Sequence, residues 1–236
     1  MSISSAKLRI SFFSFSIFIL LSVILYFYIS GLTADVYGGD VGDLVTAAVV
    51  RGVAHPPGYP LFTLLGFILS HIHLNLEPVT NVGLISVFAA IGSLYIFWNI
   101  TKLFIPNKLI QALSIGSLAF SYHFWLYSEI PEVFMLNIFL SLCLIYNVLV
   151  FYKKTEFKNL GLTFLFLGLG MSNHMTIIML VPLVVLLGIN KRREIFAFRK
   201  KLLVVPLLFL VGLLPYFYIP LAASRNPIVS CDDFIN

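Results

Sequence analysis

Long apolar runs alternate with short polar segments along the whole chain. The runs cover residues 11–30, 59–74, 80–101, 109–127, 132–152, 159–174, 175–190 and 202–221. A membrane-spanning helix needs about 20 predominantly apolar residues, and most of these runs approach that length. Because a bilayer leaves backbone polar groups no partner except one another, such runs predict helices. The pattern therefore predicts an all-α integral membrane protein.

Composition supports this class. The chain is 60% hydrophobic and 11% charged, with a mean hydropathy of +1.01, whereas soluble domains are about a quarter charged. The first run, residues 12–29, is longer than a signal-peptide core of about 7–15 residues. It predicts a retained signal anchor, with cleavage near Ser30 as the alternative. Cys143 lies in an apolar run and Cys231 near the end of the sequence, which gives no disulfide framework.

Charge decides whether the short run 59–74, which begins in a Pro-Pro-Gly turn, crosses the membrane. If it does not cross, 13 cations fall on the cytoplasmic side and only Arg51 and Arg225 fall outside, which accounts for all 15. If it crosses, every later loop changes side and 11 of the 13 move outside. The positive-inside rule favours the first arrangement. We therefore expect seven spans, a cytoplasmic N-terminus, and an outer loop over 31–79 in which 59–74 lies along the surface.

The same arrangement gathers titratable groups on the outer face. Only Glu156 and Glu194 among the ten acidic residues are then cytoplasmic. The outer set comprises Asp35, Asp40, Asp43, Glu77, Glu129, Glu132, Asp232, Asp233 and the histidines at 55, 71, 73, 123 and 174. Basic cytoplasmic loops are explained by anionic lipids, so we expect any chemistry to be extracytoplasmic.

The segment Gly38-Gly39-Asp40-Val41-Gly42-Asp43 opens the outer loop and precedes a predicted short helix over 41–51. One interpretation makes Asp40 the N-cap of this helix and Asp43 part of a capping box. The other makes them functional carboxylates, since the glycines allow a substrate to approach the backbone closely. Both interpretations remain open from the pattern.

Each of the remaining candidates also has a structural interpretation. His55 and Tyr59 lie in a stiff His-Pro-Pro-Gly-Tyr-Pro turn, and Glu129 and Glu132 lie at the outer end of a span, where acids are usually solvated. Asn173 and His174 suit the turn between two spans. Arg225 suits a lipid phosphate, including that of a lipid-linked substrate. No histidine pair has a metal-like spacing, so we predict no metal site and no cofactor, while a divalent ion stays open.

Five blocks of residues, in order, resemble a known family. They are Gly-Gly-Asp-x-Gly-Asp (38–43) with Ala47-Ala48, Gly-Val-Ala-His-Pro-Pro-Gly-Tyr-Pro-Leu (52–61), Trp-x-x-Ser-Glu-x-x-Glu-Val-Phe (125–134), Ser-Asn-His (172–174) and Leu-Leu-Pro-Tyr-x-Tyr-x-Pro-Leu (213–221). From about residue 31 onward the chain resembles the protein O-mannosyltransferase-like membrane family, whose vertebrate member mannosylates plexin-type receptors. That family resembles the GT-C glycosyltransferases.

The resemblance implies a GT-C-like module of seven transmembrane helices with an acidic motif in its first outer loop. It implies an inverting transfer of a mannose-like sugar from a polyprenyl-phosphate carrier to a hydroxyl group, in protein a serine or threonine. Asp40 would be the general base, with Asp43 at a position where family members often have glutamate. His55, Tyr59, Glu129, Glu132, Asn173, His174 and Arg225 would bind substrate.

Two departures from the family pattern qualify this expectation. The sequence ends soon after the seventh predicted span, and the family's tryptophan-containing motif is replaced around Cys231. The chain is therefore expected to be a fragment or a minimal version without an acceptor-binding domain. A truncated non-catalytic relative, or a carrier of lipid-linked sugars, is the alternative function. A carrier should have polar residues in mid-span, whereas the polar residues here gather at the outer ends. We expect the protein in the plasma membrane of a prokaryote or the endoplasmic reticulum of a eukaryote.

Overall fold

The computed structural model describes the backbone of residues 3–225 except 37, 73 and 75, and side chains from residue 16 onward. This part of the chain is all-helical. Its twelve α-helices are α1 (Ile3–Gly31), α2 (Val41–Val50), α3 (Pro60–Ser70), α4 (Pro78–Thr101), α5 (Lys108–Ala119), α6 (Tyr122–Glu129), α7 (Val133–Lys154), α8 (Phe157–Asn173), α9 (Val181–Asn190), α10 (Arg192–Ala197), α11 (Val204–Gly212) and α12 (Tyr218–Ala223). Three short 3₁₀ helices join them: η1 (Met175–Leu180), η2 (Arg199–Lys201) and η3 (Leu214–Phe217). His73, Cys231, Asp232 and Asp233 lie outside the described residues.

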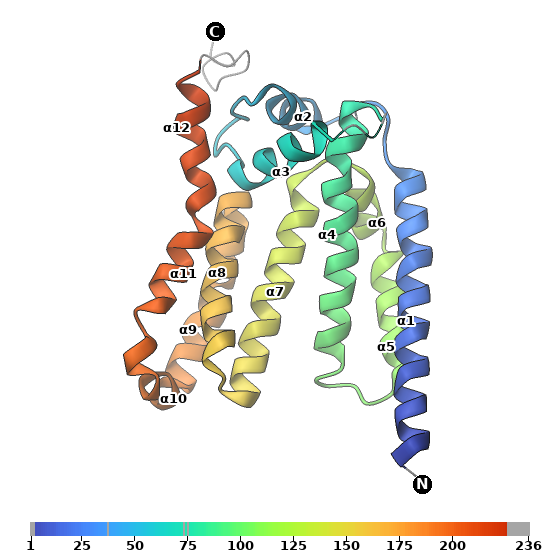
Figure 1. Cartoon of the computed structure of the whole chain (residues 1–236), viewed down its shortest axis with the longest axis vertical. Coiled ribbons are helices and arrows are strands. Elements are labelled where there is room, and N and C mark those ends of the chain that lie inside the picture. The colour runs from blue at the N-terminus through green and yellow to red at the C-terminus, as the bar shows by residue number, and fades with distance from the viewer. Residues whose placement is uncertain (1–2, 37, 73, 75, 226–236) are drawn as a thin grey trace.

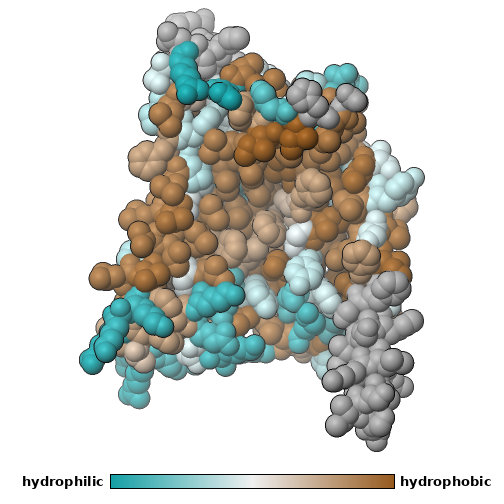
Figure 2. Space-filling model, in the orientation of Figure 1, coloured by the Kyte–Doolittle hydropathy of each residue, from teal (hydrophilic) through white to brown (hydrophobic). Residues whose placement is uncertain are grey.

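The long helices run side by side along one axis, while α2 and α3 lie across one end of the bundle (Figure 1). The largest helix contacts join α8 to α7 and to α11, and α4 to α7. Figure 2 shows apolar side chains over the middle of this face and polar ones gathered at its two ends. The predicted helix over 41–51 is confirmed as α2, whose apolar positions Val41, Leu44, Val45 and Ala48 are buried. The described part of the predicted surface run 59–74 contains one short helix, α3.

Among the residues that the structure describes, two helices, α4 and α7, are long and apolar enough to cross a membrane, and the number rises to four if each of two bent pairs counts as one span. The predicted span 109–127 is bent in the structure, because α5 and α6 meet at 61°. The Tyr28 hydroxyl donates a hydrogen bond of 2.8 Å to the Ala119 carbonyl, so a tertiary partner serves the last carbonyl of α5.

The predicted span 202–221 is also interrupted, with an angle of 43° between the segments before and after Leu213. Pro215 follows the break, and proline has no N–H to continue the helical ladder. The segment beyond the break, η3 and α12, rises beside the end of the bundle that carries α2 and α3 (Figure 1). This bend places the end of the described chain next to the outer-loop segment 51–59.

Two glycines hold α8 and α11 in close contact. A Cβ atom added to Gly168 would lie 2.3 Å from the Phe209 carbonyl oxygen, and one added to Gly212 would lie 2.6 Å from that of Leu165. No real side chain tolerates such distances from backbone atoms. Small residues at a helix crossing allow this approach, which is common between membrane helices.

Candidate active site

Asp40 and Asp43 lie at the start of α2, and the segment after α2 folds back to meet them. Gly39 precedes Asp40 with a φ of 75°, and Gly58 ends the returning segment with a φ of 90°. Both values fall in the left-handed region that glycine adopts without strain. An added Cβ at Gly58 would also lie 2.9 Å from Ile219 Cδ1. Between these two glycines, the returning segment places His55 against Asp43 in the first turn of α2.

His55 and Asp43 form the most closely bonded pair of the cluster. Asp43 Oδ2 accepts hydrogen bonds from the His55 backbone N–H at 3.0 Å and from Nδ1 of its ring at 2.7 Å. The Asp43 side chain is 13% exposed, and its Oδ1 is buried with no partner among the described residues. A carboxylate facing Nδ1 fixes the proton on that nitrogen, so Nε2 of the neutral ring is an acceptor. Asp43 therefore orients His55 instead of completing a capping box.

Asp40 has the opposite environment. Its side chain is 54% exposed, and it makes no capping hydrogen bond to α2. Its Oδ2 lies 3.5 Å from His55 Nε2. The Tyr59 hydroxyl lies 3.1 Å from the same nitrogen, as its donor when the ring is neutral. One carboxylate is thus engaged with the histidine, and the other is open to a substrate.

Tyr59 connects this group to the turn between α8 and η1. Its ring stacks on that of His174, with centroids 5.8 Å apart and an angle of 15°. Burial raises the pKa of Tyr59, and the charges of Asp40, Glu132 and Asp43 raise it further. Tyr59 therefore keeps its hydroxyl proton and can donate it to a hydrogen bond.

His174 is held in one tautomer by a short chain of hydrogen bonds. Its Nδ1 faces the Thr176 hydroxyl at 2.8 Å and accepts from the Thr176 backbone N–H at 3.3 Å. Asn137 Nδ2 donates to the Thr176 oxygen at 3.0 Å, so that hydroxyl is free to donate to His174. Burial lowers the pKa of His174. The neutral ring therefore carries its proton on Nε2 and presents a hydrogen-bond donor.

Glu132, directly before α7, supplies a third carboxyl group. It is 5% exposed, and its Oε2 has no hydrogen-bond partner in the described structure. The backbone N–H groups of Asp40 and Val133 donate to it, although burial and the charge of Asp40 together raise its pKa. The buried, partly unpartnered Glu132 thus faces the acidic loop from the side of α7.

Two predicted site residues lie elsewhere. Glu129 accepts a hydrogen bond from Trp125 Nε1 and lines a separate cavity of about 400 Å³ with Phe120 and Tyr122. Asn173 is 1% exposed, and its Nδ2 donates to the Val133 carbonyl at 3.0 Å. That bond ties the end of α8 to the start of α7 directly below the cluster.

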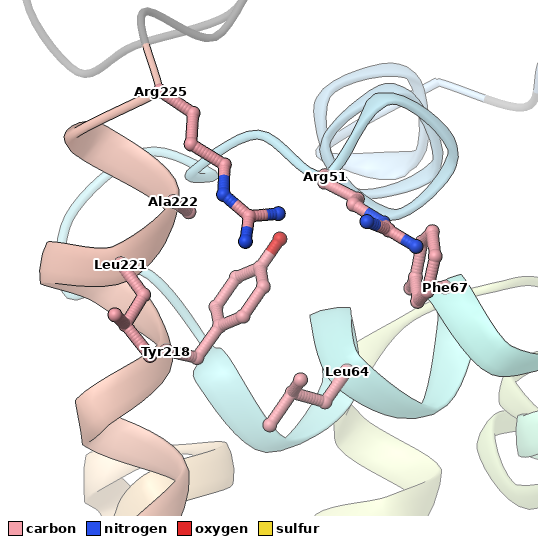
Figure 3. Close-up of a pocket in the computed structure, with 7 residues that line it drawn as sticks. All are labelled: Arg51, Leu64, Phe67, Tyr218, Leu221, Ala222 and Arg225. Atoms are coloured by element: carbon pink, nitrogen blue, oxygen red, sulfur yellow. The ribbon is translucent and has the colours of Figure 1, made fainter.

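Arg225 lies in a pocket of its own, together with Arg51 and Tyr218 (Figure 3). Arg51 follows α2 in a left-handed conformation with a φ of 59°. Since α2 has ten residues and rises about 1.5 Å per residue, this end lies about 15 Å from Asp40. The structure therefore places Arg225 beside the second cation that charge counting leaves outside.

Sequence reasoning did not select Arg51, Tyr218, Thr176 or Asn137 as site residues. For Arg51, the signal was present in the charge count, which left it and Arg225 alone on the outer face. For Thr176 and Asn137, the sequence gives no signal, because their contacts join different helices. In the part of the chain that the structure describes, no group of three or more His, Cys, Asp or Glu side chains is arranged to hold a metal ion.

Comparison with known proteins identifies relatives of this chain. Residues 40–195 match the family "Protein O-mannosyl-transferase TMEM260 N-terminal domain". Protein O-mannosyl-transferase TMEM260 of Mus musculus is 33% identical over 198 residues, which are 79% of this chain and 27% of the mouse protein. The tmem260 protein of Dictyostelium discoideum is 40% identical over 106 residues, 44% of this chain and 13% of its own length.

No solved structure matches the chain significantly. The chain spans about a quarter of the length of the mouse relative. The matched region begins at Asp40, includes His55 and Glu132, and covers more than half of the sequence. The chain therefore belongs to the TMEM260-like protein O-mannosyltransferase family, as a counterpart of the N-terminal domain.

Proposed function

We propose that this chain is the membrane catalytic part of a glycosyltransferase. The reaction would move a mannose-like sugar from a polyprenyl-phosphate carrier to a hydroxyl group of an acceptor, such as a protein serine or threonine, on the extracytoplasmic face. Family membership supports the transferase class. The observation that carries the proposal is the difference in environment between the two aspartates. Asp43 is bonded to His55, while the half-exposed Asp40 is accessible to a substrate.

In this mechanism Asp40 accepts the proton of the acceptor hydroxyl while that oxygen attacks the anomeric carbon of the donor. The new bond joins the acceptor oxygen to the anomeric carbon, and the bond from that carbon to the phosphate oxygen breaks. The polyprenyl phosphate leaves with the electron pair. Attack opposite the leaving phosphate inverts the anomeric centre.

His55 lies where the proton can be stabilised after transfer. Its Nε2 is 3.5 Å from Asp40 Oδ2, and an imidazolium there would have Asp43 on its other side. The arrangement Asp43–His55 resembles the orienting acid and base of other proton-transferring sites, in which the acid fixes the ring. We propose His55 as the residue that positions Asp40 and shares its proton.

Three neighbouring groups are suited to bind the reacting molecules. The neutral His174 offers an N–H donor, Tyr59 offers an aromatic face and a hydroxyl, and Glu132 offers a buried carboxyl oxygen with no partner in the described residues. Sugar hydroxyls need donors and acceptors in fixed positions, and a site built to bond them rejects molecules without them. Glu129, which lines a separate cavity, and Asn173, whose amide bonds the Val133 carbonyl, have no direct part in this group.

The proposed topology places this cluster outside the membrane. The basic loops at 102–108, 153–158 and 191–201 follow the ends of α4, α7 and α9, opposite to the end that carries α2 and α3 (Figure 1). Seven spans of a GT-C-like module would then use α1, α4, α5–α6, α7, α8, η1–α9 and α11–α12. The whole chain would be a single membrane domain with its N-terminus in the cytoplasm.

The direct test reconstitutes the purified chain in proteoliposomes with a mannosyl-phosphoryl polyprenol and a peptide containing serine and threonine. We expect polyprenyl phosphate and mannosyl peptide to form in equal amounts, and neither to form without peptide. A chain that binds the donor and produces neither product would refute transfer by this chain. The variants described in the Discussion then separate the roles of the residues.

A further inference from the structure

A cavity of about 400 Å³ at the bend between α5 and α6 is separate from the acidic cluster. Three aromatic rings and one carboxyl group meet in it, because its lining residues are Phe120, Tyr122, Trp125, Leu126 and Glu129. The cavity lies in the half of the bundle nearer α2 and α3, and α1 packs beside it (Figure 1). Trp125 and Glu129 belong to a block of residues that the proposed reaction leaves without a role.

The aromatic rings form walls of the cavity that are inclined to each other. The ring centroids of Phe120 and Trp125 are 5.1 Å apart, and their planes make an angle of 53°. Phe27 of α1 packs against both rings, with centroid distances of 6.4 Å. Tyr122 is 73% exposed. The faces of aromatic rings attract cations, because the ring quadrupole places negative charge above and below the plane.

The carboxyl group of Glu129 is held in place beside these rings. Trp125 Nε1 donates a hydrogen bond to Oε1 across one turn of α6. A Cβ atom added to Gly31 would overlap the Glu129 carboxyl group, so the end of α1 packs closely against it. Among the described residues, the side-chain ion pairs involve His55 and Lys191, and none includes Glu129. The half-buried carboxylate therefore has a hydrogen-bond donor but no cation.

The described chain supplies no cation to this cavity. The lining residues include no Lys, Arg or His. The other tryptophan is a contrast, because Lys102 Nζ lies 3.9 Å from the centre of the Trp98 ring, whereas no described cation lies over the Trp125 ring. Burial penalises a charge that has no compensating partner. The cavity is therefore complementary to a ligand that carries a positive group.

The surface of α5 next to the cavity indicates the rest of that ligand. Leu109, Leu113 and Phe120 are exposed, and their spacing places them on one face of α5 together with Gly116. A Cβ atom added to Gly116 would meet no described atom within 4 Å. An uncovered apolar stripe thus leads from the middle of the bundle to the cavity. A bilayer lipid with an ammonium headgroup has both parts, a cation at one end and an alkyl chain below it.

We propose that this cavity binds the ammonium headgroup of a zwitterionic phospholipid. The positive nitrogen lies against the faces of Phe120 and Trp125 and close to the Glu129 carboxylate, while an acyl chain follows the stripe along α5. The lipid neutralises a carboxylate that the described chain leaves without a cation, and it fills the angle at which α5 and α6 meet. Binding requires no sugar transfer, so the test of this site is independent of the proposed function.

The test follows the fluorescence of Trp125 in nanodiscs of phosphatidylglycerol, a lipid without an ammonium group. Trp98→Phe leaves Trp125 as the sole tryptophan of the full chain. Phosphatidylcholine that carries a nitroxide on its choline group is then added in increasing mole fraction, and it quenches a tryptophan that it contacts. The mole fraction at half-maximal quenching gives the preference of the site for this lipid over phosphatidylglycerol. We expect a preference of about threefold to tenfold, as a cation over aromatic rings provides.

Two variants in the same background test the two parts of the site. Glu129→Gln keeps an acceptor for the Trp125 N–H but removes the charge, so the preference should fall by about threefold or more. Phe120→Leu keeps an apolar side chain at a half-exposed position and removes one ring, so that protein should fold and lose about twofold. The matched control Glu77→Gln removes an exposed carboxylate that does not line the cavity and should be quenched as the parent is. No preference in the parent, or an unchanged preference in both Glu129→Gln and Phe120→Leu, would overturn the proposal.

Competition identifies the source of the ammonium group. Part of the phosphatidylglycerol is replaced by unlabelled phosphatidylcholine or phosphatidylethanolamine. Equal displacement of the labelled lipid by the two assigns the site to any ammonium headgroup, and stronger displacement by phosphatidylcholine assigns it to a quaternary one; both uphold the proposal. Displacement by a lysine-rich peptide added in water, with no effect of either unlabelled lipid, would overturn it and assign the cavity to a peptide side chain.

Discussion

The substitution Asp40→Asn separates the catalytic and structural interpretations of the outer loop. Asparagine has the shape of aspartate but accepts no proton near neutral pH. As a general base, Asp40 should contribute about 10²–10⁴ in rate. A hundredfold loss corresponds to about 2.7 kcal/mol of transition-state stabilisation. We therefore expect sugar transfer to slow by at least about a hundredfold.

The structure predicts a much smaller effect on folding. Asp40 makes no capping hydrogen bond, so the substitution leaves no backbone N–H without a partner. Its contact with His55 Nε2 is 3.5 Å long and its side chain is 54% exposed. Exposed pairs of this kind are worth at most about 1 kcal/mol. Stability should therefore change by less than half of the expected change in activation free energy.

The assay combines single-turnover transfer from bound donor with thermal unfolding followed by tryptophan fluorescence. Asp35→Asn is the matched control, because Asp35 is an exposed carboxylate in the same outer segment. We expect that control to transfer sugar at the wild-type rate. A stable Asp40→Asn protein with near-normal turnover would refute the assignment of Asp40 as base. It would then direct attention to His55.

Three further predictions follow from the same geometry. Asp43→Ala removes the acceptor for the His55 ring, so we expect a loss of about 1–3 kcal/mol in unfolding free energy together with slower transfer; unchanged stability in urea titration would contradict the role of Asp43. Glu132 has a raised pKa, so the native state holds its proton longer than the unfolded chain and stability should fall as pH rises from about 4.5 through the folded-state pKa. Glu132→Gln should remove that part of the pH dependence, and an identical stability profile in the variant would refute it. A cysteine introduced at Glu77 in a Cys143→Ser, Cys231→Ser background should react with an impermeant reagent from outside intact cells, whereas one at Lys158 should be protected; the reverse pattern would show that 59–74 crosses the membrane.

The sequence was informative where residues near each other act together. Periodic apolar positions predicted α2, and the grouping of Asp40, Asp43 and His55 in one outer loop anticipated their contacts. The capping-box interpretation of Asp43 failed because its carboxylate bonds a residue twelve positions away. Local pattern cannot choose between a backbone N–H in the same turn and one that returns from a later loop.

The remaining features depend on packing between distant segments. The stack of Tyr59 on His174 and the approach of Glu132 to Asp40 join helices that no local pattern pairs. Hydropathy also missed both bends, because it measures how apolar a run is and not whether its helix continues. At the first bend, the Ala119 carbonyl at the end of α5 accepts a hydrogen bond from the Tyr28 hydroxyl. At the second bend, Pro215 has no N–H to continue the helix.

The glycine contact between α8 and α11 has a consequence for the distant arginine pocket. Gly168 and Gly212 set how closely α11 approaches α8, and α11 leads through η3 into α12, which carries Tyr218 and precedes Arg225. The crossing therefore determines where η3 and α12 begin. A single methyl group added at Gly212 would push α8 and α11 apart and would shift Arg225 relative to Arg51. The width of the arginine pocket thus depends on two glycines in the middle of the bundle.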